Sequence, residues 1–202
     1  MQINPISFTQ NYISSTWVKN AKTNKNEQMD FVEFEDCPQD KVLLEQTVSR
    51  WEKLSPLTYG TEIYEGYRNA VDENDFDKHF YGLTDNNGTI QVLAEINTGD
   101  REICFYDPEL SNKKPFEILF LSANPKSTAN KEKREYKGLG SAMVKELVTL
   151  AGKKKKDYIA LDDANYSFWH KMPYFKSVKD SPKRILKSED YQKCTKELDL
   201  MI

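Results

Sequence analysis

The chain has 202 residues, of which 30% are charged and 38% hydrophobic, and its formal net charge is −3. This length suits one globular domain with a heavily charged surface. Because the sequence contains no apolar run of about eighteen residues, we expect no membrane-spanning helix, and the small negative charge gives no general attraction to nucleic acid.

Cysteines and histidines give no sign of a metal site. Cys37, Cys104 and Cys194 are far apart and form no CxxC pair, which favours a reducing compartment and predicts a cytoplasmic protein. His79 and His170 lie in no ligand motif. We therefore expect no metal. The N-terminal segment lacks a basic leader and an apolar stretch, so it is not expected to be a secretory signal.

The chain begins with a predicted polar arm over residues 1–28, and a single domain is predicted over 29–202. Residues 29–35 (MDFVEFE) alternate apolar and acidic side chains, as in a half-buried strand. Asp36 can then cap a helix over 38–54, whose apolar residues fall at helical spacing.

A second helix is predicted over 61–71, and strands follow it. Residues 79–84 and 89–96 flank Asp-Asn-Asn-Gly, a strong hairpin signal because Asn and Gly tolerate positive φ. Residues 101–106 predict a further strand.

The most apolar strand is predicted over residues 116–123 (FEILFLSA), and we expect it near the centre of the sheet. A long basic loop leads from it to a helix over 138–153. The rest of the chain predicts a strand over 158–161, a short helix over 166–172, a strand over 174–178 and a charged tail with a helix over 188–198.

The loop before residue 138 ends in two glycines, and a helix starts at once. This arrangement directs unpaired backbone N–H groups at one place, where the positive end of the helix dipole favours a pyrophosphate. The chain has no GxxxxGK[ST] loop, and Gly138-Leu139-Gly140 is followed by Met143 where a dinucleotide fingerprint needs Gly or Ala. Asp162 stands at the distance of a ribose ligand, which is weak support. With these two nucleotide loops excluded, the interpretation that remains is a mixed sheet in which a strand end and the helix N-terminus bind a pyrophosphate.

Two segments resemble motifs of the GNAT superfamily of acyl-coenzyme A-dependent N-acyltransferases. Residues 135–140 (EYKGLG) are similar to its pyrophosphate motif Gln/Arg-x-x-Gly-x-Gly/Ala, with Glu135 in the first position. Residues 167–175 (SFWHKMPYF) are similar to its late segment Phe-Tyr-x-Lys-x-Gly-Phe, with Trp169 in place of Tyr. The resemblance covers roughly 29–178. It implies an α/β (α+β mixed) fold with a central mixed, mostly antiparallel sheet flanked by helices.

The resemblance implies acetyl-coenzyme A (acetyl-CoA) as the co-substrate. In this family the strand before the loop splays from its neighbour and pairs with the pantetheine arm, while loop N–H groups hold the pyrophosphate. The glycines are needed there because a Cβ would block close approach. The positions implied along the strand are Leu119, Leu121 and Ser122, and those at the loop are Lys137, Gly138, Leu139, Gly140 and Ser141.

Two more side chains are candidates for contact with acetyl-CoA. Arg134, the last cation of the basic loop with Lys126, Lys131 and Lys133, could supply the charge that Glu135 does not. The alternative is a solvated, mobile loop. Asn165 is implied to bond the pantetheine, or else it is a helix cap.

The chemistry needs a base for the amine and a proton donor for the thiolate. Glu117 stands where some family members place the base, and burial beside an apolar strand would raise the pKa of its carboxyl. Otherwise it is an ordinary edge carboxylate, and Glu95 is the substitute. Because the indole of Trp169 has no accessible acid chemistry, the candidate donors are Tyr166 and Tyr174, which could instead be packing aromatics.

Three functions are compatible with these residues. The favoured one is an N-acetyltransferase that transfers an acetyl group from acetyl-CoA to an amine by direct attack in a ternary complex. The others are a domain that binds acyl-CoA without chemistry and a protein-interaction module without a cofactor. The expected partner is a small-molecule or peptide amine, with no membrane and no nucleic acid, and a homodimer is left open.

Overall fold

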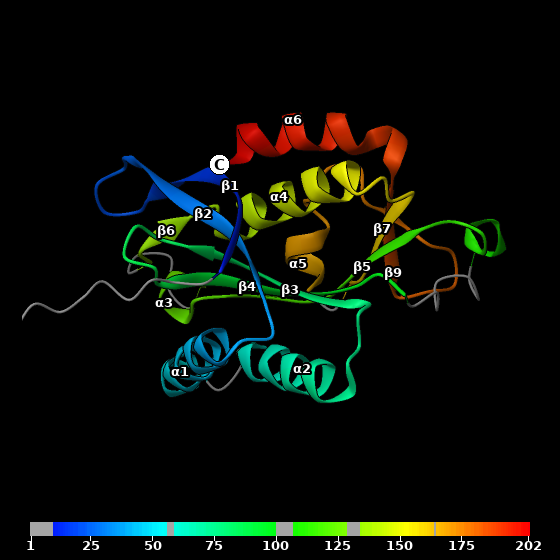
Figure 1. Cartoon of the computed structure of the whole chain (residues 1–202). Coiled ribbons are helices and arrows are strands. Elements are labelled where there is room, and N and C mark those ends of the chain that lie inside the picture. Colours follow the sequence, from blue (N-terminus) through cyan, green and yellow to red (C-terminus); the bar gives the residue numbers. More distant parts are fainter. Residues whose placement is uncertain (1–9, 56–58, 100–106, 129–133, 164) are drawn as a thin grey trace, which may run out of the picture.

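The computed structural model describes residues 10–55, 59–99, 107–128, 134–163 and 165–202, apart from the side chain of Tyr166. Within these residues one sheet separates two layers of helices (Figure 1). Helices α1 (Pro38–Leu54) and α2 (Gly60–Glu73) lie on one face. Helices α4 (Leu139–Lys153), α5 (Tyr166–Trp169) and α6 (Tyr191–Met201) lie on the other, with α6 outside α4. A short helix, α3 (Pro125–Thr128), follows the fifth strand.

The described part of the sheet has nine strands in the order β6-β1-β2-β3-β4-β5-β7-β9-β8. Neighbouring strands are antiparallel except β5 and β7, which are parallel. The predicted mixed, mostly antiparallel sheet flanked by helices is therefore confirmed. The strands are β1 (Asn11–Asn20), β2 (Asn26–Phe34), β3 (Lys78–Thr84), β4 (Ile90–Asn97), β5 (Pro115–Ala123), β6 (Tyr136–Lys137), β7 (Tyr158–Asp162), β8 (Lys176–Ser177) and β9 (Lys183–Lys187).

The predicted polar arm is in large part sheet. β1 pairs with β2 along its whole length, from Asn11 opposite Glu33 to Lys19 opposite Asn26. Val18 is completely buried against α4. Residues 11–20 and 26–28 thus belong to the sheet, with a turn between them, which corrects the prediction of an arm there, while residues 1–9 lie outside the described residues. The sequence hid the strand because its inward side chains include polar Thr16 and few apolar residues.

The first helix follows the predicted pattern but has a different cap. α1 spans the predicted range, and Leu44, Val48 and Trp51 are buried as their spacing indicates. The cap is Cys37 and not Asp36, since the Sγ of Cys37 accepts a hydrogen bond of 3.4 Å from the backbone N–H of Asp40.

The hairpin between β3 and β4 forms where Asp-Asn-Asn-Gly predicts it. Gly88 adopts a φ of 70° and donates its N–H to the carbonyl of Asp85 at 2.8 Å. The carboxylate of Asp85 accepts the N–H groups of Asn87 and Thr89. The turn therefore fixes the register of two strands whose side chains are almost all buried.

The last part of the chain adds a strand that the sequence did not reveal. The tail from residue 181, predicted as charged, contains β9, and its Lys183 and Arg184 are buried at 4% and 7% exposure. The predicted C-terminal helix is confirmed as α6, which packs on α4 through Cys194 and Leu198. The strand predicted over 101–106 lies outside the described residues.

The position of α4 depends on its buried face, because α4 lies between the sheet and α6 (Figure 1). We predict that Leu147→Ala, at a site with no exposed surface, lowers the free energy of unfolding by about 2–5 kcal/mol through lost burial and a cavity. Urea unfolding followed by circular dichroism measures it. The control Val42→Ala, at a position of α1 that is 49% exposed, should change the value by less than about 0.5 kcal/mol. Equal losses in both variants would contradict this packing.

Candidate active site

Two parallel strands pair over only part of their length. Pairing between β5 and β7 runs from Pro115 opposite Tyr158 to Ile118 opposite Leu161, and β7 ends one residue later. β5 continues to Ala123. Its second half therefore keeps β4 as a neighbour but has left β7, so the described sheet is split along one edge of β5.

A bulge marks the point of the split. Glu95 of β4 lies opposite Phe120, whereas the next residue, Ile96, lies opposite Ile118, so Leu119 is the extra residue of β5. A bulge bends the strand and changes which face its side chains meet. Phe120 consequently packs toward α1 and α2, where its ring lies 5.9 Å from that of Tyr59.

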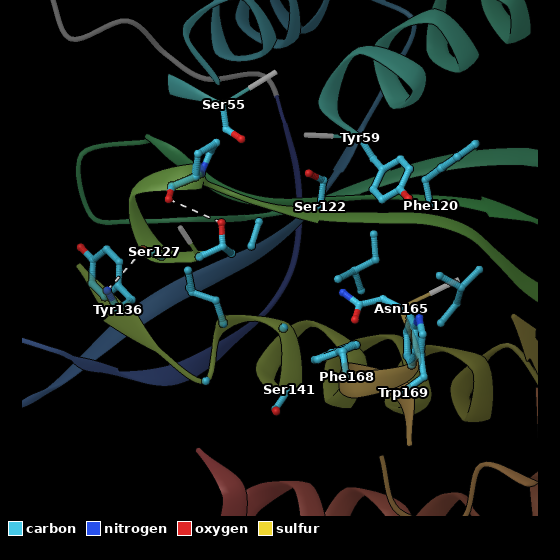
Figure 2. Close-up of a pocket in the computed structure, with 18 of the residues that line it drawn as sticks. Ser55, Tyr59, Phe120, Ser122, Ser127, Tyr136, Ser141, Asn165, Phe168 and Trp169 are labelled. Carbon is cyan, nitrogen blue, oxygen red and sulfur yellow. Dashed lines mark hydrogen bonds between the residues drawn. The ribbon is translucent and has the colours of Figure 1, made fainter. Parts of the chain in front are cut away.

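A pocket of about 680 Å³ occupies the split. It lies between the second half of β5, the N-terminus of α4 and helix α5 (Figure 2). Most of the predicted acetyl-CoA contacts line it, namely Leu119, Leu121, Ser122, Arg134, Gly138, Leu139, Gly140, Ser141 and Asn165. Lys137 is in β6 beside the pocket and is not among its lining residues. One pocket thus gathers these residues, although their role in binding stays a prediction.

The glycine loop has the geometry that an anion site requires. Gly138 caps α4 with a φ of 77°, a left-handed conformation that favours glycine. A Cβ on Gly140 would lie 2.8 Å from the ring of Phe168, so only glycine lets α5 pack this closely. The first N–H groups of a helix have no partner within it. Gly140 and Ser141, which carry such N–H groups at the start of α4, line the pocket.

Arg134 supplies a positive charge at the same end. Among the described lining residues it is the one cation, and its Nε is buried without a hydrogen-bond partner in the described structure. A buried N–H that lacks an acceptor costs about 1–3 kcal/mol, so a phosphate oxygen there would be stabilising. Glu135, which replaces the family's Gln or Arg, turns instead toward Lys126, with 3.6 Å between the charged atoms.

The predicted catalytic side chains lie elsewhere. Glu117 is 3% exposed, does not line the pocket and accepts a hydrogen bond from the ammonium of Lys183. The hydroxyl of Tyr174 lies outside the pocket and donates to Glu197 of α6 at 3.0 Å. Tyr166 begins α5, and its side chain is outside the described atoms. The pocket therefore gathers the binding candidates without Glu117 or Tyr174.

Glu95, the substitute base, is also buried. Its carboxyl is 2% exposed and faces Lys78, with 3.4 Å between the charged atoms. Burial raises the pKa of Glu95, and the Lys78 ammonium opposes that rise. The residue lies opposite Phe120 but does not line the pocket.

Several lining residues were not among the site residues predicted from the sequence. They are Ser55, Tyr59, Ser127 and Tyr136 among the polar ones, together with Phe168. Asp162 and Trp169, to which the sequence assigned no role in acetyl-CoA binding, line the pocket as well. Burial, followed by the nearby carboxylates of Glu27 and Asp85, raises the pKa of Tyr136 to about 12. Its phenol is therefore a protonated hydrogen-bond donor at neutral pH.

The described parts of the chain show neither a metal site nor a membrane-spanning helix. There, no group of three or more His, Cys, Asp or Glu side chains is arranged to hold a metal ion. None of the helices described there combines the length and apolar character needed to cross a membrane.

Comparison with known proteins identifies the fold. No sequence-family profile matches this chain, and no curated protein sequence matches it. Solved structures do match. An acetyltransferase of the GNAT family from Listeria monocytogenes is 13% identical, with a TM-score of 0.54 over 84% of this chain and 97% of that chain.

Two further solved structures are similar to this chain. FeeM, an N-acyl amino acid synthase from uncultured soil microbes, is 10% identical, with a TM-score of 0.53 over 86% of this chain and 99% of that chain. YhbS, a GNAT family N-acetyltransferase from Escherichia coli solved with CoA, is 11% identical, with a TM-score of 0.52 over 82% and 84%. The protein therefore has the GNAT fold, as its two motifs predicted.

The contact between Gly140 and Phe168 can be tested by a double-mutant cycle. We predict that Gly140→Ala lowers the free energy of unfolding by about 1–3 kcal/mol because the added Cβ overlaps the Phe168 ring. In a Phe168→Ala background this loss should disappear. Urea unfolding measures all four proteins.

Gly152→Ala, on the same helix, is the matched control. A Cβ there meets Tyr191 at an ordinary 3.5 Å, so the change should be neutral or stabilise by about 1 kcal/mol. If Gly140→Ala lowers the free energy of unfolding just as much in the Phe168→Ala background, the proposed contact is contradicted.

Proposed function

We propose that the protein is an acyl-CoA-dependent N-acyltransferase that transfers an acetyl group from acetyl-CoA to an amine by direct attack in a ternary complex. One observation carries the proposal. The pocket follows β5 after its separation from β7 and ends at the N-terminus of α4, beside an arginine with an unsatisfied Nε. This combination suits a long ligand with amide groups at one end and phosphates at the other.

The chain offers each part of acetyl-CoA a chemically suitable partner. Backbone groups of Leu119–Leu121 suit the pantetheine amides, as an added strand would. The N–H groups of Gly140 and Ser141, with the α4 dipole and Arg134, suit the pyrophosphate. Acetyl-CoA itself would supply the activated thioester. The fold of YhbS, which was solved with CoA, supports this choice of ligand.

For the chemistry, Glu117 remains the proposed base and Tyr166 the proposed donor to the thiolate. Glu117 is on the face of β5 opposite α4, and Lys183 holds its carboxylate. It would have to exchange this partner for the amine or for a water that reaches it. Tyr174 is the weaker donor, because its hydroxyl already donates to Glu197. The separated cysteines support a cytoplasmic setting.

A domain that binds acyl-CoA without transferring the acyl group is the second candidate. Two observations favour it: the buried pairing of Glu117 with Lys183, and Trp169 in the place of the family's tyrosine. It shares the ligand with the first candidate and differs in turnover, so binding and rate must be measured separately.

Binding is the first prediction. Isothermal titration should show acetyl-CoA binding at micromolar levels, and Arg134→Ala should weaken it about tenfold or more, the size expected for a charge-assisted bond to phosphate. The control Lys126→Ala removes a cation that is 53% exposed and does not line the pocket. It should change affinity by less than about threefold. If the wild-type protein shows no binding, both candidates are wrong.

The second prediction concerns the base. If Glu117 deprotonates the amine, Glu117→Gln should lower the rate of thiol release at least about tenfold, while the acetyl-CoA dissociation constant stays unchanged. Thiol release with a panel of primary amines measures the rate, and circular dichroism checks the fold. An unchanged rate would remove Glu117 from the mechanism.

A further inference from the structure

Asp162 is the one acidic side chain among the described residues that line the pocket. It ends β7 at the point where β5 and β7 separate. Its side chain is 53% exposed, and its Oδ1 lies 3.6 Å from the Nζ of Lys183. A carboxylate in this position faces whatever molecule enters the pocket near the split.

The ammonium of Lys183 is shared between two carboxylates. Lys183 and Glu117 are both buried and in direct contact, so their charges cancel where solvent screening is weakest. The neighbouring Asp163 is compensated by Arg184, with 2.7 Å between Oδ2 and Nε. This group of side chains therefore keeps about one negative charge, and its exposed member is Asp162.

The direction of Asp162 follows from the alternation of β7. Ile159 and Leu161 pack under α4, whereas Tyr158 and Ala160 pack on the opposite face of the sheet. Alternation places Asp162 on that opposite face. This is the face covered by α1 and α2, whose connection contributes Ser55 and Tyr59 to the pocket (Figure 2).

The two charges of the pocket are separated along it. Tyr136, which closely follows Arg134 in the chain, and Asn165, which closely follows Asp162, lie on opposite sides of the pocket in Figure 2. Arg134 shortly precedes the glycine loop in the chain, whereas Asp162 ends β7 shortly before α5 begins, so the cation belongs to the glycine-loop end of the pocket and the carboxylate to the end near α5. An anionic ligand and a cationic ligand would each find their complement at a different end.

From this arrangement we infer that Asp162 selects a polyamine-type acceptor, a primary amine that carries a second positive charge. This inference rests on the proposed N-acyltransferase activity. The attacking nitrogen must be neutral when it attacks, so a charge paired with Asp162 during transfer belongs to another nitrogen. An acceptor with a carboxylate in that place would be repelled.

The test compares two acceptors of similar length, cadaverine and 5-aminopentanoate, by thiol release with saturating acetyl-CoA. The wild-type protein should prefer cadaverine about tenfold or more in kcat/KM, the size of one partly desolvated ion pair. Asp162→Asn should remove most of this preference through the KM for cadaverine. Asp162→Lys should reverse it. The acetyl-CoA affinity of Asp162→Asn, measured by titration, should stay within about twofold, because the phosphates are proposed to bind at the other end of the pocket.

Asp199→Asn is the matched control. Asp199 is 57% exposed and lies 2.6 Å from a lysine, Lys145 of α4, but it does not line the pocket. The preference for cadaverine should be unchanged in this variant. Cadaverine binding in the presence of CoA, measured by titration, gives a second readout that needs no turnover, and it should weaken in Asp162→Asn and not in Asp199→Asn.

The outcomes separate this inference from the proposed function. If the protein does not bind acetyl-CoA, both are wrong. If it acetylates amines but Asp162→Asn keeps the wild-type preference, only the role of Asp162 is wrong. A wild-type protein that favours 5-aminopentanoate, or that binds acetyl-CoA and acetylates neither amine, would also overturn the proposed acceptor class.

Discussion

The early end of the pairing between β5 and β7 is the constraint on which the site depends. The N–H and C=O groups of a strand edge need hydrogen-bond partners, and a buried edge cannot obtain all of them from bulk water. Past Ile118, β5 runs along a pocket where a neighbouring strand would otherwise lie. The bulge at Leu119 turns Phe120 toward α1 and α2. The N-terminus of α4 lies at the glycine-loop end of the pocket. An extended ligand with amide groups could pair with that edge.

The distribution of charge gives the pocket a direction. Arg134 and the first N–H groups of α4 make one end positive, while Asp162, held near Lys183, makes the end near α5 negative. Coenzyme A is strongly anionic at its phosphates and neutral at its thioester. If the pocket binds acetyl-CoA as proposed, the phosphates would be attracted to the loop and the negative end would remain for an amine. This polarity would let one pocket accept two substrates of opposite charge.

The sequence predicted the parts of the fold that depend on local signals. The spacing of Leu44, Val48 and Trp51 gave α1, and Asp-Asn-Asn-Gly gave the hairpin, because apolar periodicity and turn residues act within a few positions. The glycine loop also predicted where α4 begins, which is the end of that helix that lies at the pocket. β1 and β9 were missed because their buried side chains include Thr16, Lys183 and Arg184, whose burial depends on partners distant in the sequence. A role for Asp162 could not be predicted from the sequence, because it depends on the sheet, which places this carboxylate beside both Lys183 and the pocket.

The central claim is that the split of the sheet binds acetyl-CoA with its phosphates at the glycine loop. A crystal structure of the protein soaked with acetyl-CoA tests this claim most directly. The account predicts pyrophosphate oxygens within hydrogen-bond distance of the N–H groups of Gly140 and Ser141, the pantetheine arm along Leu119–Leu121 of β5, and the thioester toward the Asp162 end. Acetyl-CoA bound at another surface, or a pocket that stays empty at saturating ligand, would contradict it.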